Sequence, residues 1–218
     1  MFRVSSLCAF AAIGALTASA ASAGTVVVNV GAESDIFLAG QTSVPTDFPY
    51  NPSAPGAPGD GAGALPVPIG VTAGETLDIT ASGLASCCYG VAPYSGPAGL
   101  GGTSSISGYG NVAAYSGPQF PLVGVFGGPT LGTSWSIFVI GAADTLTVPT
   151  GATTLYLGLP DSLGFNDPPG YYNDNTGSFT VDVSGVPEPA AWALMLAGFA
   201  GLGVALRANR RGVAALRA

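Results

Sequence analysis

The chain contains no histidine, and none of its five basic residues lies between residues 24 and 186. The lack of histidine excludes Ser–His–Asp and Cys–His nucleophile systems, a histidine general base and histidine-ligated zinc. The lack of basic side chains argues against a nucleic-acid partner, because nothing in that segment can neutralise phosphate. Charged residues make up only 8% of the chain, but 48% of the residues are hydrophobic and can form a packed core. With 34 Gly and 18 Pro, we expect one loop-rich domain.

The segment 24–186 is purely acidic. Its eleven carboxylates are Glu33, Asp35, Asp47, Asp60, Glu75, Asp78, Asp144, Asp161, Asp167, Asp174 and Asp182. No salt bridge between side chains can form there, so carboxylates held close together would need an outside cation. Oxygens of Asp, Asn and backbone carbonyls suit calcium best. The alternative is that these acids are scattered over the surface and solvated one by one.

Residues 1–23 have the organisation of a secretory signal peptide. One basic residue, Arg3, precedes an apolar stretch over residues 4–16, and small residues end the segment at Ala21-Ser22-Ala23. Segments of this kind are removed on export. We therefore expect an exported domain over residues 24–185, and we expect Cys8 to be lost with the signal.

The C-terminal segment has three parts in a fixed order. A motif at residues 186–189, an uncharged apolar run over residues 190–206 and a basic end over residues 207–211 follow one another. The motif reads Val186-Pro187-Glu188-Pro189. The 17 residues of the apolar run reach the lower limit of about 17 for crossing a hydrocarbon core, which predicts a single transmembrane helix. The arginines that follow favour a cytoplasmic C-terminus, with residues 212–218 as a short cytoplasmic extension.

This order of motif, apolar helix and basic end resembles the PEP-CTERM sorting tail. The resemblance implies that an exosortase recognises the tail and cleaves it near the motif, while residues 190–206 hold the chain in the membrane. We therefore expect export through the inner membrane and a final location at the cell envelope, at the cell surface or in the extracellular matrix.

Short strands dominate the exported segment. Polar and apolar residues alternate over residues 76–80, 144–148 and 178–183, and apolar runs of strand length cover residues 26–30, 121–126, 135–140 and 154–159. Seven or more short strands without an internal helix predict an all-β fold, an antiparallel β-sandwich of the jelly-roll or galactose-binding-like type. The Gly-rich and Pro-rich segments 44–68 and 95–110 are expected to be long loops.

The densest polar cluster lies between two of these predicted strands, over residues 161–177. It contains three Asp and three Asn, namely Asp161, Asn166, Asp167, Asn173, Asp174 and Asn175. A loop of this composition can fold several oxygens around one calcium ion, which takes about six to eight of them. The spacing and the closing Glu of an EF-hand are absent. The alternative is an ordinary turn rich in Asp and Asn.

The same segment resembles the calcium loop of the galactose-binding PA-IL type lectins, which are small β-sandwich proteins. Residues 166–179 can be laid without gaps on that loop and the strand after it. The resemblance implies side-chain calcium ligands at Asp167, Asp174 and Asn175, and a backbone carbonyl ligand at Tyr171. A further carbonyl ligand maps to Tyr89, since residues 81–86 resemble the segment that precedes it.

The resemblance decides neither the first carboxylate ligand nor the sugar specificity. Asp167 keeps the spacing of the lectin loop, whereas Asp161 directly follows the predicted strand 154–159, where the first carboxylate would stand if the loop carries an insertion. Both are candidate ligands. The sugar-contacting histidine of those lectins has no counterpart in this chain, so their galactose specificity does not transfer.

Cys87 and Cys88 are adjacent and would be exported to a compartment where thiols can oxidise. Three states are open, namely a vicinal disulfide, two free thiols, or bridges to another chain. We favour the vicinal disulfide, because no basic neighbour or histidine is present to stabilise a reactive thiolate.

These observations favour a calcium-dependent carbohydrate-binding domain at the cell surface that engages extracellular polysaccharide. The alternative is a structural matrix or adhesion protein in which calcium only stabilises a loop. A glycosidase that uses two carboxylates would need a raised-pKa acid facing a partner across a cleft, and nothing in the sequence singles out such a pair. We therefore do not expect an enzyme.

Overall fold

The computed structural model describes residues 24–46, 61–88, 94–186, 196, 198–203 and 207. The predicted signal peptide, Pro187, Glu188, Pro189, much of the apolar run 190–206 and the extension 212–218 lie outside the described residues. Residues 196, 198–203 and 207 are helical. Within the part of the chain that the structure describes, no helix combines the length and hydrophobicity needed to cross a membrane.

The described domain is built from strands and three short 3-10 helices. The strands are β1 (Gly24–Gly31), β2 (Val67–Gly70), β3 (Thr76–Ser86), β4 (Leu100–Ile106), β5 (Tyr115–Gln119), β6 (Val123–Gly127), β7 (Ile137–Val139), β8 (Ala143–Thr147), β9 (Thr154–Gly158) and β10 (Thr176–Val186). The 3-10 helices are η1 (Ile36–Leu38), η2 (Leu163–Phe165) and η3 (Tyr172–Asp174).

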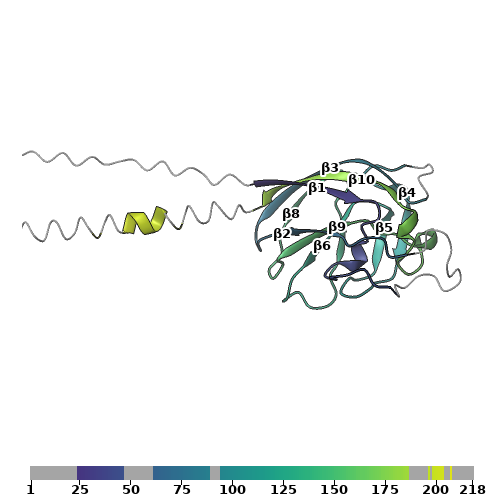
Figure 1. Ribbon diagram of the computed structural model, residues 1–218, viewed down its shortest axis with the longest axis horizontal. Coiled ribbons are helices and arrows are strands. Elements are labelled where there is room, and N and C mark those ends of the chain that lie inside the picture. The colour runs from purple at the N-terminus through teal and green to yellow at the C-terminus, as the bar shows by residue number, and fades with distance from the viewer. Residues whose placement is uncertain are drawn as a thin grey trace, which may run out of the picture.

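Two four-stranded sheets face each other, which confirms the predicted antiparallel β-sandwich. The first has the order β1-β10-β3-β8 and the second the order β2-β9-β6-β7. All the strand pairs within these sheets are antiparallel. Figure 1 shows β1, β10 and β3 lying over β2, β6 and β9, with the separate hairpin of β4 and β5 at one end.

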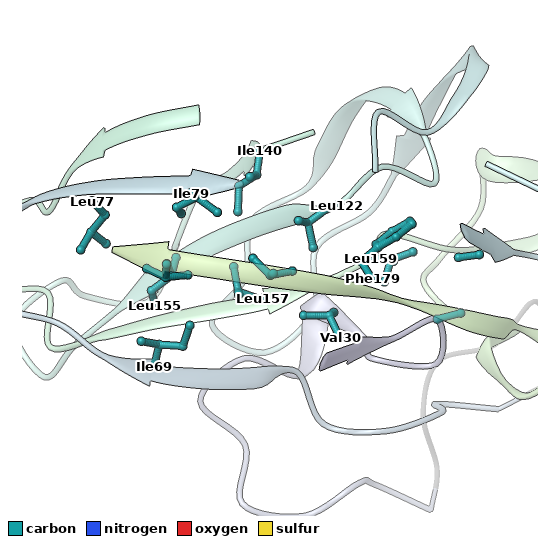
Figure 2. Packing of buried hydrophobic residues seen from close by; sticks show 14 of the residues in the cluster. Val30, Ile69, Leu77, Ile79, Leu122, Ile140, Leu155, Leu157, Leu159 and Phe179 are labelled. Carbon is teal, nitrogen blue, oxygen red and sulfur yellow. The ribbon is translucent and has the colours of Figure 1, made fainter. Parts of the chain in front are cut away.

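The core lies between the two sheets because alternate residues of each strand point inward. In β3, Leu77 and Ile79 are buried while Asp78 between them is exposed. Leu155 and Leu157 of β9 are fully buried and belong to the same cluster. Figure 2 shows these side chains from the two layers gathered in one interior, with the first sheet's Val30 and Phe179 and the loop residues Leu122 and Ile140 also lining it.

The prediction of a long loop over residues 95–110 was wrong. Residues Leu100–Ile106 form β4, which pairs with β5. Ser104 and Ile106 are buried while the residues between and before them are exposed, so the strand period is present. Serine occupies an inward position, and two glycines lie where the register shifts, so the composition resembled that of a loop. The strands β2 and β5 were likewise not predicted, since each contains a proline.

The register brings four chain segments together at one end of the sandwich. Gly31 at the end of β1 pairs with Ser178, and Ser86 at the end of β3 pairs with Thr176. The segment just after β1 also runs beside the end of β9, through a parallel bridge between Asp35 and Leu159. The acidic loop 161–175 connects β9 to β10 and is therefore held at this end.

Candidate cation site

The acidic loop begins at Asp161, just beyond β9, and is divided by a short antiparallel bridge between Ser162 and Pro169. This bridge loops out residues 163–168, which include η2 and Asp167. Within that excursion the Asp167 amide donates to Ser162 Oγ at 3.4 Å, and Asp167 is half-buried. Asp161 stays in the body of the domain, where only 2% of it is exposed. The two candidate first carboxylates therefore lie in different surroundings.

The Tyr172 hydroxyl fixes the position of Asp161. It donates to the Leu159 carbonyl oxygen at 2.9 Å and accepts from the Asp161 amide, also at 2.9 Å. The ring of Tyr172 is fully buried, so these bonds lie in the interior. The backbone on both sides of the loop is thereby held, because the Gly170 amide also donates to the Asp161 carbonyl oxygen at 3.2 Å.

Asn175 and Asp174 approach the same place from η3. The Asn175 amide nitrogen of the backbone donates to the Tyr172 carbonyl at 3.2 Å, and its side-chain Nδ2 donates to the Ala32 carbonyl at 3.2 Å. Asn175 is 2% exposed, whereas Asp174 is partly open to solvent. These bonds hold Asn175 beside the Asp161 carboxylate and leave Asp174 at the margin.

Three side-chain oxygens at this point are buried and have no hydrogen-bond partner. They are Asp161 Oδ2, Asp174 Oδ1 and Asn175 Oδ1. Buried acceptors of this kind are costly unless something satisfies them. Across the described segments, no three carboxyl or thiol groups come together in a way that would hold a metal ion. A cation here would therefore have to draw on amide and backbone oxygens as well as on two carboxylates.

Burial in a domain without basic side chains perturbs the acids of the site. It raises the pKa of Asp161 well above its ordinary value, although the neighbouring Asn175 amide and the Ser162 backbone amide lower it; the charge of Asp174 raises it further. Burial also raises the pKa of Asp174 to about 6. Burial therefore disfavours the ionised form of Asp161 unless a positive charge is supplied, whereas Asp174 is still largely ionised at neutral pH.

Asp35 is a member of this cluster that the sequence analysis did not single out. It is fully buried, and its Oδ1 caps η1 by accepting from the Phe37 amide at 2.8 Å, while its Oδ2 has no partner. Burial raises the pKa of Asp35, and its charge raises the pKa of both Asp161 and the Tyr172 hydroxyl. The sequence offers one indication of this burial. Asp35 directly precedes the apolar run Ile36-Phe37-Leu38, and an acid next to a buried run is buried with it.

Of the two predicted carbonyl ligands, the structure describes Tyr171 but not Tyr89. Tyr171 lies in the loop, is 7% exposed and has a left-handed backbone with φ of 70°, which is unfavourable for a bulky residue. Such strain is often found at functional positions. Tyr89 lies outside the described residues. The cysteines that precede it, Cys87 and Cys88, directly follow β3, and their Sγ atoms lie 2.7 Å apart without a bond between them in this structure.

Comparison with known proteins bears on the C-terminal segment most directly. Residues 185–211 match the PEP-CTERM protein-sorting motif, which confirms the predicted sorting tail. The chain is thus exported and sorted to the cell envelope or surface. One solved structure, described as the EclA N-terminal domain, a PllA-like lectin, is similar over 72% of this chain and 93% of that chain, with 19% identity and a TM-score of 0.38. No curated protein matches the chain.

Proposed function

We propose that the exported domain binds calcium through Asp161, Asp174 and Asn175, and that the bound ion presents open coordination positions to a carbohydrate. The backbone carbonyl of Tyr171 is the fourth proposed ligand. Asp167 is the alternative first carboxylate. The proposed ligand class is extracellular polysaccharide, and the proposed processing partner of the tail is an exosortase.

One observation carries the cation part of this proposal. Three buried acceptor oxygens without partners meet in a domain whose folded segment contains no basic side chain. A protein cation cannot satisfy them, so they must be protonated, hydrated or bound to a metal ion. A hard cation with oxygen ligands suits this set of two carboxylates and one amide. Calcium would supply a positive charge that stabilises both carboxylates in the ionised form.

The carbohydrate part rests on the loop's resemblance to the PA-IL type lectins and on the partial exposure of Asp174. Asp161 and Asn175 are buried and can hold the inner side of an ion. Asp174 lies at the margin, so the outer side of an ion held there would face solvent. Neighbouring sugar hydroxyls can replace water at such positions.

The test is calorimetric titration of calcium into the exported protein, followed by a glycan screen with calcium and with a chelator. We expect calcium binding by the unchanged protein and its loss in the double variant Asp174→Ala, Asn175→Ala. Asp182→Asn is the matched control, because it removes a carboxylate from the exposed face of β10. Calcium binding that survives in the double variant, or is lost in the control, would contradict the proposed site.

The glycan screen separates the leading proposal from its alternative. A glycan that binds with calcium and is released by the chelator supports the carbohydrate-binding domain. Calcium binding without any glycan leaves the second proposal, a matrix or adhesion protein whose loop is stabilised by the ion.

A further inference from the structure

Two thiols stand at the end of the sandwich that holds the candidate site. Cys87 and Cys88 directly follow Ser86, the last residue of β3, which pairs with Thr176 next to Asn175 in the chain. Cys87 is 7% exposed and lies close enough to Asp161 for the two charges to interact, whereas Cys88 is exposed to solvent. One sulfur therefore faces the site and the other faces the medium.

The backbone holds the two sulfur atoms against each other. Their Sγ atoms are 2.7 Å apart, and the Cys88 amide donates to Ser86 Oγ at 3.3 Å. Just before them, Ala85 exchanges two backbone hydrogen bonds with Ser95, of 3.0 and 2.8 Å, which fixes the end of the strand. The sulfurs are therefore already near the bonding distance of about 2.05 Å, and both residues lie beyond the last residue of β3.

The location of the protein favours a bond between the two sulfurs. The folded segment has no basic residue that would hold either cysteine as a reactive thiolate. The protein is exported to a compartment that permits oxidation.

We propose that Cys87 and Cys88 are joined by a vicinal disulfide in the exported protein, and that this bond fixes the wall of the candidate site beside Asp161. The oxidant is a disulfide of an exported thiol oxidase. The exposed Cys88 thiolate attacks one of its sulfurs, and the first thiol leaves. Cys87 then gives up its proton and attacks Cys88 Sγ, which releases the second thiol. One disulfide is consumed, one is formed, and both protons end on the released dithiol.

The effect of this bond is local. A disulfide stabilises mainly by closing a loop in the unfolded chain, and adjacent residues enclose almost none. We therefore expect reduction to leave the melting temperature of the domain nearly unchanged. The backbone of the acidic loop, which faces Cys87, should instead become more open to exchange with solvent.

The first measurement is alkylation of the exported protein, acid-quenched at harvest and then unfolded, before and after reduction. We expect no labelled cysteine in residues 84–88 before reduction and two after it. Cys88→Ser, with one remaining thiol, should be labelled without reduction and is the control for access. Two labelled thiols before reduction, or a reducible dimer, would overturn the disulfide.

The second measurement is hydrogen exchange of the oxidised and reduced protein in calcium-free buffer. We expect several-fold faster exchange over residues 161–175 on reduction, with β8 unchanged. Equal exchange in both forms would overturn the role of the bond at the site. Neither measurement uses calcium, so this inference and the proposed cation site can fail separately.

Discussion

Replacing Asp161 by Asn should stabilise the calcium-free domain and remove the stabilisation that calcium gives to the unchanged protein. The two side chains have the same shape, so the variant would retain an oxygen for the Ser162 amide, which now donates to Asp161 Oδ1 at 2.8 Å. The replaced atom is Oδ2, which is buried and has no partner. In its place the new amide nitrogen can donate to the unpartnered oxygens of Asp174 or Asn175.

The magnitude follows from the cost of that oxygen. A buried acceptor without a partner costs about 1–3 kcal/mol, and more when it is charged. For a domain of this size 1 kcal/mol corresponds to about 2–4 °C in melting temperature. In a chelator at pH 7.5, Asp161→Asn should therefore raise the melting temperature by about 2–12 °C. Calcium at a hundred times its Kd should stabilise the unchanged protein by about 2.7 kcal/mol and the variant hardly at all.

Differential scanning calorimetry of both proteins, with calcium and with chelator, measures all four values. Asp167→Asn is the matched control, because it removes the other candidate carboxylate from the looped-out segment. If Asp161→Asn melts below the unchanged protein in chelator, the carboxylate is satisfied within the fold and the reasoning fails. If calcium stabilises Asp161→Asn as much as the unchanged protein and Asp167→Asn not at all, Asp167 is the first ligand.

Two further predictions concern pH and backbone geometry. Because burial raises the folded-state pKa of Asp161 and raises that of Asp174 to about 6, the calcium-free fold binds protons more tightly than the unfolded chain. Its melting temperature should therefore be highest below about pH 4, where the unfolded chain is also protonated, and fall as the pH rises from there through about 6, with saturating calcium flattening the profile; a calcium-free maximum above pH 7 would contradict these shifts. Gly177→Ala should destabilise the domain by about 2 kcal/mol or more in chemical denaturation, because Gly177 has a φ of 88° and an added Cβ would meet the Leu84 carbonyl oxygen. Gly74→Ala has a similar φ of 82° but open space around it, so it should cost less, and equal losses would rule out the backbone contact as the cause.

The sequence predicts the strands whose inward residues are large and apolar. In β3 and β10 the alternation of Leu, Ile, Val and Phe with polar residues is plain, β9 is indicated by its apolar run, and these strands carry much of the core. Prediction from the hydrophobic pattern fails for β4, where a buried serine takes an inward position and glycines accommodate the irregular register. Patterns of hydrophobicity cannot reveal a strand whose buried side chain is small and polar.

Some residues of the candidate site can likewise be predicted from the local sequence, and others cannot. Asp174 and Asn175 could be found from local composition, because η3 places neighbours in sequence near one another. The surroundings of Asp161 depend on the bridge between Ser162 and Pro169, which loops out Asp167 and is a pairing that no local spacing shows. Asp35 enters through contacts made across the fold, with Leu159 and Tyr172, and these are beyond the reach of any motif.

The orientation of β10 connects the candidate site to the sorting tail. This strand begins at Thr176, directly after Asn175, and ends at Val186, where the sorting motif begins to lead out of the domain. A strand of 11 residues spans about 33 Å at roughly 3.3 Å per residue. The acidic loop therefore lies at the end of the sandwich remote from the point where the tail leaves it. A domain attached through its tail would present the loop away from the attachment, which fits the proposed binding of an extracellular polysaccharide.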